Sequence, residues 1–291
     1  MGATQSSNNL GQDIIDAFKL ATCVNGPSDV TVMTSNDLNA SIMMFGETHH
    51  TASNPLCTNF ETILRALLPD CRRRHRPNTL PIHCFVEANI SSSPQSIASG
   101  TVRHNIADVT NYATLANLEK IRCKDIETVF FYNADVFGRV RGMCLLQEHN
   151  FYKTCYKCMA RIVTVGRGNY TRYLNTAGNQ TEYIQLIRRQ FLQTIKDWPI
   201  QYTQFVNRQS QTLMTSYFAV NTLDNAYLTV FKLMSMFGDC YLVKAMMQKC
   251  NRSQLIISYN GRKHVRNMTT LLSTLNYTVA EKMDLPNARV I

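Results

Sequence analysis

The sequence lacks the segments that direct a chain into or across a membrane. Its N-terminus is polar, without the apolar stretch of a signal peptide, and no apolar run reaches the roughly 20 residues of a bilayer-spanning helix. Also missing are a Gly-x-Ser-x-Gly elbow and the glycine-rich loops that bind nucleotides. These absences predict a cytoplasmic, non-secreted protein, and they disfavour a serine hydrolase and nucleotide-dependent chemistry.

Charged residues are scarce, at 17% of the chain, and basic residues outnumber acidic ones by 30 to 20, which gives a formal net charge of +10. A basic chain favours acidic partners. No nucleic-acid-binding module accompanies the charge, so nucleic acid is disfavoured as a partner. The run Arg72-Arg-Arg-His-Arg76 has two interpretations. It is either a patch for an anionic membrane surface or a solvated loop after a helix end, where cations are favourable.

The N-terminal residues Met1-Gly-Ala-Thr-Gln-Ser6 fit the pattern for N-myristoylation, with Gly2 as the modified residue. The alternative is a disordered polar leader. A single myristoyl chain binds membranes only marginally, so stable anchoring would need a second signal such as the arginine run. If the protein is viral, this interpretation predicts a host-cytoplasmic protein that associates with membranes through Gly2.

Ten cysteines in a chain without a signal peptide predict a reducing compartment and mostly free thiols. Cys155 and Cys158 form a single Cys-x-x-Cys motif. A structural zinc site needs four ligands, and no other cysteines stand at a matching distance. We therefore interpret this pair as two thiols on one face of a helix.

Short uninterrupted apolar runs predict strands that are buried on both faces, as in parallel sheets. They lie at 42–45, 80–86, 126–132 and 255–259, with shorter strands at 30–33, on a sheet edge, and 277–280. Apolar residues at helical spacing predict helices at 10–23, 60–68, 112–122, 181–198, 202–217, 224–250 (a helical pair, or one helix kinked at Gly238) and 265–275. The pattern predicts an α/β fold with a central, mostly parallel or mixed sheet flanked by helices. Residues 1–40 form an N-terminal leader and helix, and residues 41–291 a single domain with a helical insertion at about 140–220.

Two of the predicted strands run into the same short motif. The run that ends at Phe45 is followed by Gly46, Glu47, His49 and His50, and the run that ends at Tyr259 is followed by Asn-Gly-Arg-Lys-His264. The chain therefore carries Gly-x-x-His twice, each copy after a strand. Because ligands of open α/β sheets bind beyond the carboxyl ends of the strands, both copies are candidates for one site.

A glutamate follows a third strand, since Glu87 comes directly after the run 80–86. If the first and last motif strands are parallel neighbours, His49 and His264 meet with Glu47 and Glu87. Such a set suits zinc, iron or manganese, with His49, His264 and Glu87 as ligands. The same residues also suit a metal-free mechanism, in which a histidine is the general base and Arg139 or the second histidine stabilises an oxyanion. The structural alternative is that the histidines only hydrogen-bond the strand ends.

The paired motifs with Glu87 between them resemble the Tiki/TraB/ChaN/erythromycin-esterase superfamily, over about residues 40–280. The resemblance implies that Gly46–His49, Gly261–His264 and Glu87 converge on one site. The superfamily includes esterase-like, protease-like and haem-binding members. His50 also fits the Gly-Glu-x-x-His spacing of the esterase-like branch, so either histidine of the first motif could be the functional one.

Three further residues look like motifs of uncharacterised superfamily members encoded by large DNA viruses: Asp135, Arg139 and Asp239. Asp135 is either a hydrogen-bond partner of a site histidine or a turn cap. Asp239 lies in an apolar helical segment, where a buried carboxylate needs an arginine or imidazole partner.

Three functions are compatible with these features. The first is a hydrolase of ester or peptide bonds with a small-molecule or peptide substrate. The second is a non-catalytic protein that uses the same pocket for haem, a metal or a small ligand. The third is a membrane-associated viral interaction protein that no longer uses the site.

Overall fold

The chain divides into two units that share one long helix. The computed structural model describes residues 4–37, 41–47, 57–59, 82–86, 129–133, 170–219, 222–251 and 255–285. The first unit comprises Met1–Gly138 and Leu242–Ile291, and the second comprises Arg139–Tyr241. The insertion expected at about 140–220 falls within the second unit.

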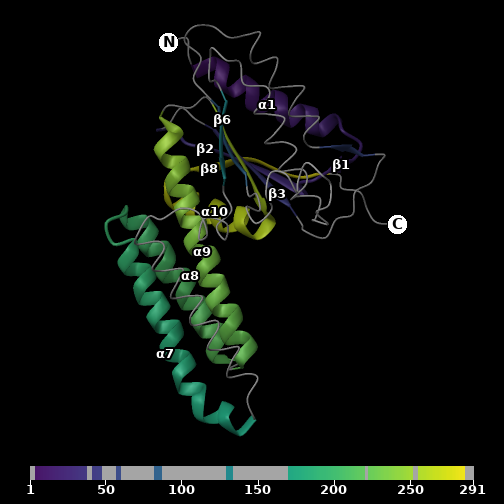
Figure 1. Ribbon diagram of the computed structural model, residues 1–291. Coiled ribbons are helices and arrows are strands. Elements are labelled where there is room, and N and C mark those ends of the chain that lie inside the picture. The colour runs from purple at the N-terminus through teal and green to yellow at the C-terminus, as the bar shows by residue number, and fades with distance from the viewer. Residues whose placement is uncertain are drawn as a thin grey trace, which may run out of the picture. The chain divides into compact units, whose positions relative to one another are not determined.

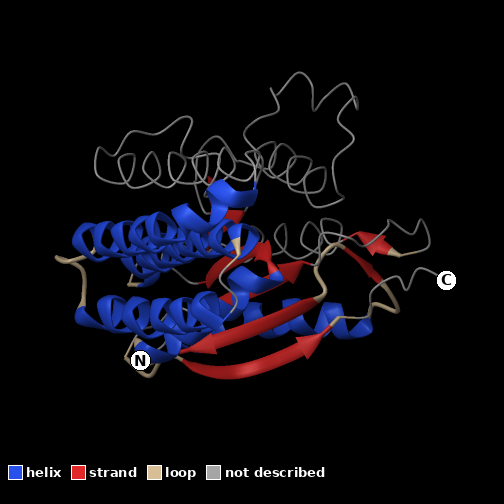
Figure 2. Ribbon diagram, turned by 90° about the horizontal axis from the view of Figure 1, so that it is seen from below, coloured by secondary structure: helices blue, strands red, loops and turns tan. Residues whose placement is uncertain are grey.

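A six-stranded mixed sheet forms the centre of the first unit (Figures 1 and 2). Its order is β6-β5-β7-β3-β2-β8. The first four strands in this order are mutually parallel, whereas β2 is antiparallel to both of its neighbours. The strands are β2 (Asp29–Thr34), β3 (Ser41–Glu47), β5 (Ile82–Val86), β6 (Val129–Asn133), β7 (Leu255–Gly261) and β8 (Thr278–Asp284). The α/β class and the mixed sheet predicted from the sequence are confirmed.

The two central motif strands are buried on both faces, as their unbroken apolar runs predict. Every residue from Ile42 to Glu47 is buried, as is all of β7. By contrast, β8 is mostly exposed and forms the sheet edge. The strand that the sequence placed on an edge at 30–33 is internal, because β8 pairs with its outer side.

Two helices cover the sheet from opposite faces. Helix α1 (Thr4–Leu20) packs Ile14, Ile15 and Phe18 into a core with alternate sheet residues, among them Met43 and Phe45. Helix α10 (Arg262–Thr274) begins directly after β7 and packs against the other face (Figure 1). Its buried side chains are Val265, Met268, Leu271 and Leu272. Because successive strand residues point to opposite faces, Met44 and Gly46 belong to the α10 face.

A small two-stranded parallel sheet joins the end of α1 to the segment after β3. It consists of β1 (Val24–Asn25) and β4 (Thr58–Asn59). A disulfide between Cys23 and Cys57 precedes the first paired residues, and the Thr58 amide donates to the Cys23 carbonyl at 3.0 Å. The expectation of free thiols is therefore wrong at these two positions. The two cysteines are separated by 34 positions in the sequence and meet through strand pairing. The number of cysteines alone does not predict such a pair.

Three long helices lie side by side in the second unit: α7 (Tyr170–Thr194), α8 (Ile200–Ala219) and the first part of α9 (Leu223–Cys250) (Figures 1 and 2). The apolar stripe of α7 is buried, and Phe191 meets Phe237 of α9 edge to face at 5.1 Å. Pro199 separates α7 from α8 because proline suits the start of a helix and not its interior.

Helix α9 is continuous, so Gly238 does not divide it. A helical glycine costs about 1 kcal/mol relative to alanine, but the flanking Phe237 and Cys240 are buried and hold the helix together. Residues Asn225–Cys250 are long and apolar enough to span a membrane by length and composition, with a mean hydropathy of 1.2. In the structure 67% of that apolar window is buried, which is also typical of a core helix.

Candidate functional site

The carboxyl ends of three adjacent strands meet at one edge of the sheet. β3 and β7 pair in parallel register, with Gly46 opposite Asn260 and Glu47 opposite Gly261. On the other side of β7, Val86 of β5 pairs with Tyr259. The parallel pairing of the two motif strands, which the sequence argument assumed, is thus observed. The glycines that open the two motifs and Val86, the residue before Glu87, therefore lie at the same edge.

Three of the candidate residues belong to the described part of the chain. Glu47 is the last residue of β3 and is 3% exposed. His264 lies in the first turn of α10 and is half-buried. Asp239 is buried in α9 within the second unit and contributes, after burial itself, to raising the pKa of the Cys240 thiol. The remaining candidates lie outside the described residues: Gly2, His49, His50, Glu87, Asp135 and Arg139.

Glu47 and His264 approach the edge from different faces of the sheet. Strand alternation puts Glu47 on the same face as Met43 and Phe45, which is the face that α1 covers. His264 is carried by α10, which covers the other face. A ligand that contacts both side chains would therefore lie across the ends of the strands and not over either face.

Position 46 requires glycine because a side chain would not fit there, and not because the backbone has a conformation that only glycine adopts readily. A Cβ atom on Gly46 would overlap the carboxylate of Asp29 and would lie 3.3 Å from the Cα atom of Arg262. Gly46 is not among the residues with positive φ in the described part of the chain. The missing side chain lets β2, β3 and the first residue of α10 approach one another closely.

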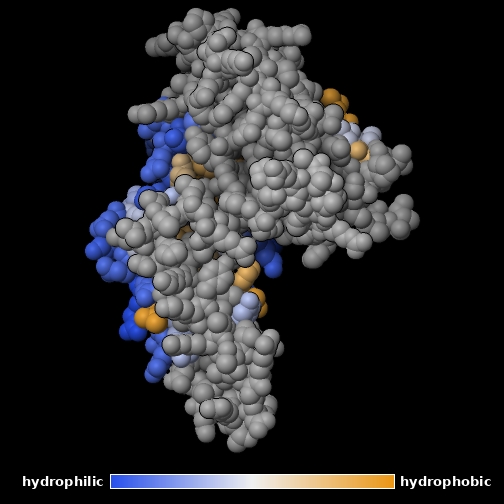
Figure 3. All heavy atoms as spheres, in the orientation of Figure 1, coloured by the Kyte–Doolittle hydropathy of each residue, from blue (hydrophilic) through white to orange (hydrophobic). Residues whose placement is uncertain are grey.

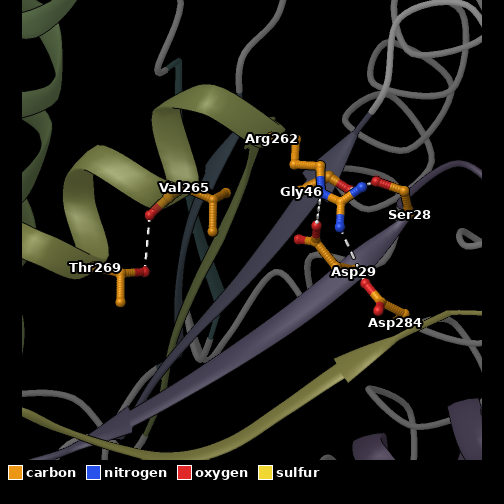
Figure 4. Close-up of polar contacts among 7 residues, drawn as sticks. All are labelled: Ser28, Asp29, Gly46, Arg262, Val265, Thr269 and Asp284. Carbon is orange, nitrogen blue, oxygen red and sulfur yellow. Dashed lines mark hydrogen bonds and ion pairs between the residues drawn. The ribbon is translucent and has the colours of Figure 1, made fainter.

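An arginine from the second motif contacts the Asp29 carboxylate beside Gly46 (Figure 4). Arg262 Nε lies 2.5 Å from Asp29 Oδ2, and Arg262 Nη2 donates to Asp284 Oδ1 at 3.1 Å. The contact with Asp29 is an ion pair and not an aligned hydrogen bond, because Nε has no hydrogen-bond partner of suitable geometry. Asp29 is paired with Gly46 and with Asp284 in the sheet, so the three share one face.

Asp29 is almost fully buried, with 5% of its side chain exposed. Burial raises the pKa of its carboxyl group, and the Arg262 guanidinium opposes that shift only in part. Arg262 therefore stabilises an ionised carboxylate that would otherwise be costly inside the fold. Asp29 lies against Gly46 of the first motif and pairs with Arg262 of the second, so this β2 residue links the two Gly-x-x-His segments.

The turn before β2 is hydrogen-bonded to Gly46 as well. Both the amide and the hydroxyl of Ser28 donate to the Gly46 carbonyl, at 2.6 and 3.0 Å. The Leu285 amide in turn donates to the Ser28 carbonyl at 2.9 Å. The first motif is thus anchored through its backbone as well as through Asp29.

Polar side chains continue into the sheet behind the second motif. Asn260 and Ser258 are buried on the α10 face of β7, and the Asn260 amide donates to the Ser258 hydroxyl. Sequence reasoning missed this pair together with Asp29 and Arg262. The available signals were a charged residue at the start of an apolar strand and two polar residues inside the run 255–261.

One buried histidine belongs to the sheet interior. His83 pairs with Ile256 of β7 and lies three residues before the end of β5. Burial, followed by the positive charge of Lys249, lowers its pKa to about 4. His83 is therefore neutral at physiological pH, and its position inside the strand separates it from the motif residues at the edge.

Within the described ranges, no three His, Cys, Asp or Glu side chains are grouped closely enough to hold a metal ion. Glu47 and His264 supply a carboxylate and an imidazole at the sheet edge, donor types that suit zinc, manganese or iron. The other expected ligands, His49 and Glu87, lie outside the described residues.

No family model, curated protein or solved structure matches the chain. The superfamily resemblance therefore remains a prediction that rests on the paired motifs.

Proposed function

We propose that the protein is a hydrolase of ester or peptide bonds whose site lies at the carboxyl edge of β5, β7 and β3. The observation that carries the proposal is the in-register parallel pairing of β3 with β7. This pairing brings Glu47 opposite Gly261, so the strands that lead into the two motifs end side by side although they are far apart in the sequence. Together with Glu87, the motif residues Glu47, His49 and His264 supply two glutamates and two imidazoles, which can act together on a bound substrate.

In this proposal the histidines have complementary roles. One of His49 and His264 acts as a general base toward water, oriented by Glu47 or Glu87, and the other stabilises the developing oxyanion with Arg139. His50 replaces His49 if the Gly-Glu-x-x-His spacing is the functional one. A divalent zinc, manganese or iron ion held by His49, His264 and Glu87 would supply a Lewis acid and a more acidic water when bound.

The test combines metal content and turnover in wild type, His49→Ala, His50→Ala and His264→Ala. His104→Ala is the matched control, because it removes an imidazole outside both motifs. The four variants and the wild type are purified without chelator and analysed by plasma mass spectrometry. They are then assayed on p-nitrophenyl esters and fluorogenic peptides. We expect His264→Ala and one of the two first-motif variants to lose at least about 100-fold in turnover, while the control retains it.

Unchanged turnover in His264→Ala would contradict the hydrolase proposal. If no substrate is turned over but the wild type takes up haem with a Soret band that His264→Ala lacks, the same edge is a binding site without catalysis. The membrane-associated interaction protein would be favoured if the wild type binds anionic vesicles, if this binding requires Gly2, and if none of the three histidine substitutions changes it.

A further inference from the structure

A cavity of about 380 Å³ lies between α7 and α8, within the second unit. Two arginines and two glutamines line it, next to two apolar side chains. These are Arg188, Arg189, Gln185, Gln211, Met214 and Phe218. The cavity thus combines positive charge and amide groups with an apolar wall.

Arg188 is held in a fixed direction by α8. Its Nε donates to the Ser210 hydroxyl at 2.8 Å, and its Nη2 donates to the Asn207 side-chain oxygen at 3.1 Å. Ser210 is fully buried and its hydroxyl donates to the Asn207 carbonyl at 3.2 Å. Both acceptors are neutral, so they orient the guanidinium group without cancelling its charge.

Within the described ranges, neither Arg188 nor Arg189 forms an ion pair with a carboxylate. The sequences of α7 and α8 contain a single acidic residue, Glu182, which does not line the cavity. Arg188 is half-buried and Arg189 is exposed, and their like charges repel each other when no counter-charge lies between them. An anion bound between Arg188 and Arg189 would supply that charge.

We propose that this cavity binds a phosphate monoester with an apolar substituent. The two guanidinium charges match a phosphate dianion, and arginine forms charge-assisted hydrogen bonds to phosphate oxygens. Gln185 and Gln211 add amide donors. Met214 and Phe218 provide a surface for the substituent, and the Phe218 side chain is 54% exposed. Figure 3 shows mainly hydrophilic residues, with apolar ones among them, along the side where α7 lies in Figure 1.

The site is tested on the full-length protein by isothermal titration with phenyl phosphate, inorganic phosphate, benzoate and benzyl alcohol. Arg189→Gln removes one of the two charges, and Arg208→Gln is the matched control, since Arg208 is an exposed arginine of α8 that does not line the cavity. We expect Arg189→Gln to weaken phenyl phosphate binding at least about tenfold, and Arg208→Gln to change it less than about twofold. Benzoate should bind more weakly than phenyl phosphate, and benzyl alcohol should give no binding heat.

A second variant tests the apolar wall. Phe218→Gln should weaken phenyl phosphate at least about threefold while leaving the affinity for inorganic phosphate unchanged. The proposal is overturned if phenyl phosphate gives no saturable heat, or if both arginine variants lose affinity equally. Tighter binding of benzoate would overturn the phosphate assignment, and equal affinities for inorganic and phenyl phosphate would overturn the role of Met214 and Phe218.

Discussion

Replacing Gly46 by alanine tests the close approach that joins the two motifs. The added Cβ would overlap the Asp29 carboxylate and lie 3.3 Å from Arg262 Cα. Overpacking of this kind costs about 1–3 kcal/mol. Moving the carboxylate also disturbs its ion pair with Arg262, which adds a cost because Asp29 is buried. We expect Gly46→Ala to lower the free energy of unfolding by about 2–4 kcal/mol.

A double-mutant cycle can show how much of this loss of unfolding free energy comes from the overlap with Asp29. In an Asp29→Ala background the overlapping carboxylate is gone, and only the tight contact with Arg262 remains. The cost of Gly46→Ala should then fall below about 1 kcal/mol, so the two changes should be coupled by about 1–3 kcal/mol. Unfolding in urea, followed by far-UV circular dichroism, measures each corner of the cycle.

Gly11→Ala is the control for the glycine substitution itself. A Cβ on Gly11 would meet Met43 at 4.0 Å, which is ordinary contact. Because Gly11 lies within α1, alanine should raise stability by about 0.5–1 kcal/mol. A Gly46→Ala penalty below about 0.5 kcal/mol, or an equal penalty with and without Asp29, would refute the account of the motif glycine.

Three further predictions concern stability in urea. Arg262→Gln should cost about 1–3 kcal/mol of unfolding free energy at pH 7, since Arg262 is partly exposed. The stability difference from wild type should grow as pH rises from 4 to 7, because Asp29, whose folded pKa is raised, then ionises without a counter-charge. A stability difference independent of pH would exclude this role of Arg262. The folded pKa of His83 is lowered to about 4 from 6.5, so wild type should lose about 2–3 kcal/mol as pH falls from 6.5 to 4, whereas His83→Leu should lack that component. An equal slope in the two proteins would place the titration elsewhere. Replacing Cys23 and Cys57 together by serine should cost about 4 kcal/mol in the chain-entropy description of their crosslink, and reduction of wild type should have the same effect. Equal stability of oxidised and reduced protein would show that this crosslink does not stabilise the fold.

Those predicted helices and central strands that the structure describes were predictable because their signals are local, whereas the helices predicted at 60–68 and 112–122 lie outside the described residues. The apolar run 42–45 specifies a strand buried on both faces wherever its neighbours come from. The stripe Ile184, Ile187 and Phe191 specifies one buried helical face. At Gly238 the sequence left a helical pair or one kinked helix open, and the structure has one helix because the packing of Phe237 and Cys240 outweighs a helix propensity of about 1 kcal/mol.

The polar network around the motifs was not predictable from the same signals. Asp29 stands before an apolar strand and Arg262 within a motif, and neither position indicates that the two side chains meet. Their contact requires β2 to lie beside β3 and α10 to begin above Gly46. The face of Glu47 likewise follows from the position of α1 and not from the order of residues.

The sequence by itself determined the α/β class, the strands with motifs at their ends and the residue types available for chemistry, because these depend on local periodicity and turn residues. Only the tertiary structure decided that β7 lies between β3 and β5, that Cys23 pairs with Cys57, and that the Asp29 carboxylate, paired with Arg262, takes the space that a side chain on Gly46 would need. These outcomes depend on contacts between segments far apart in the chain, whose energies arise only when the strands are ordered and the helices packed on them.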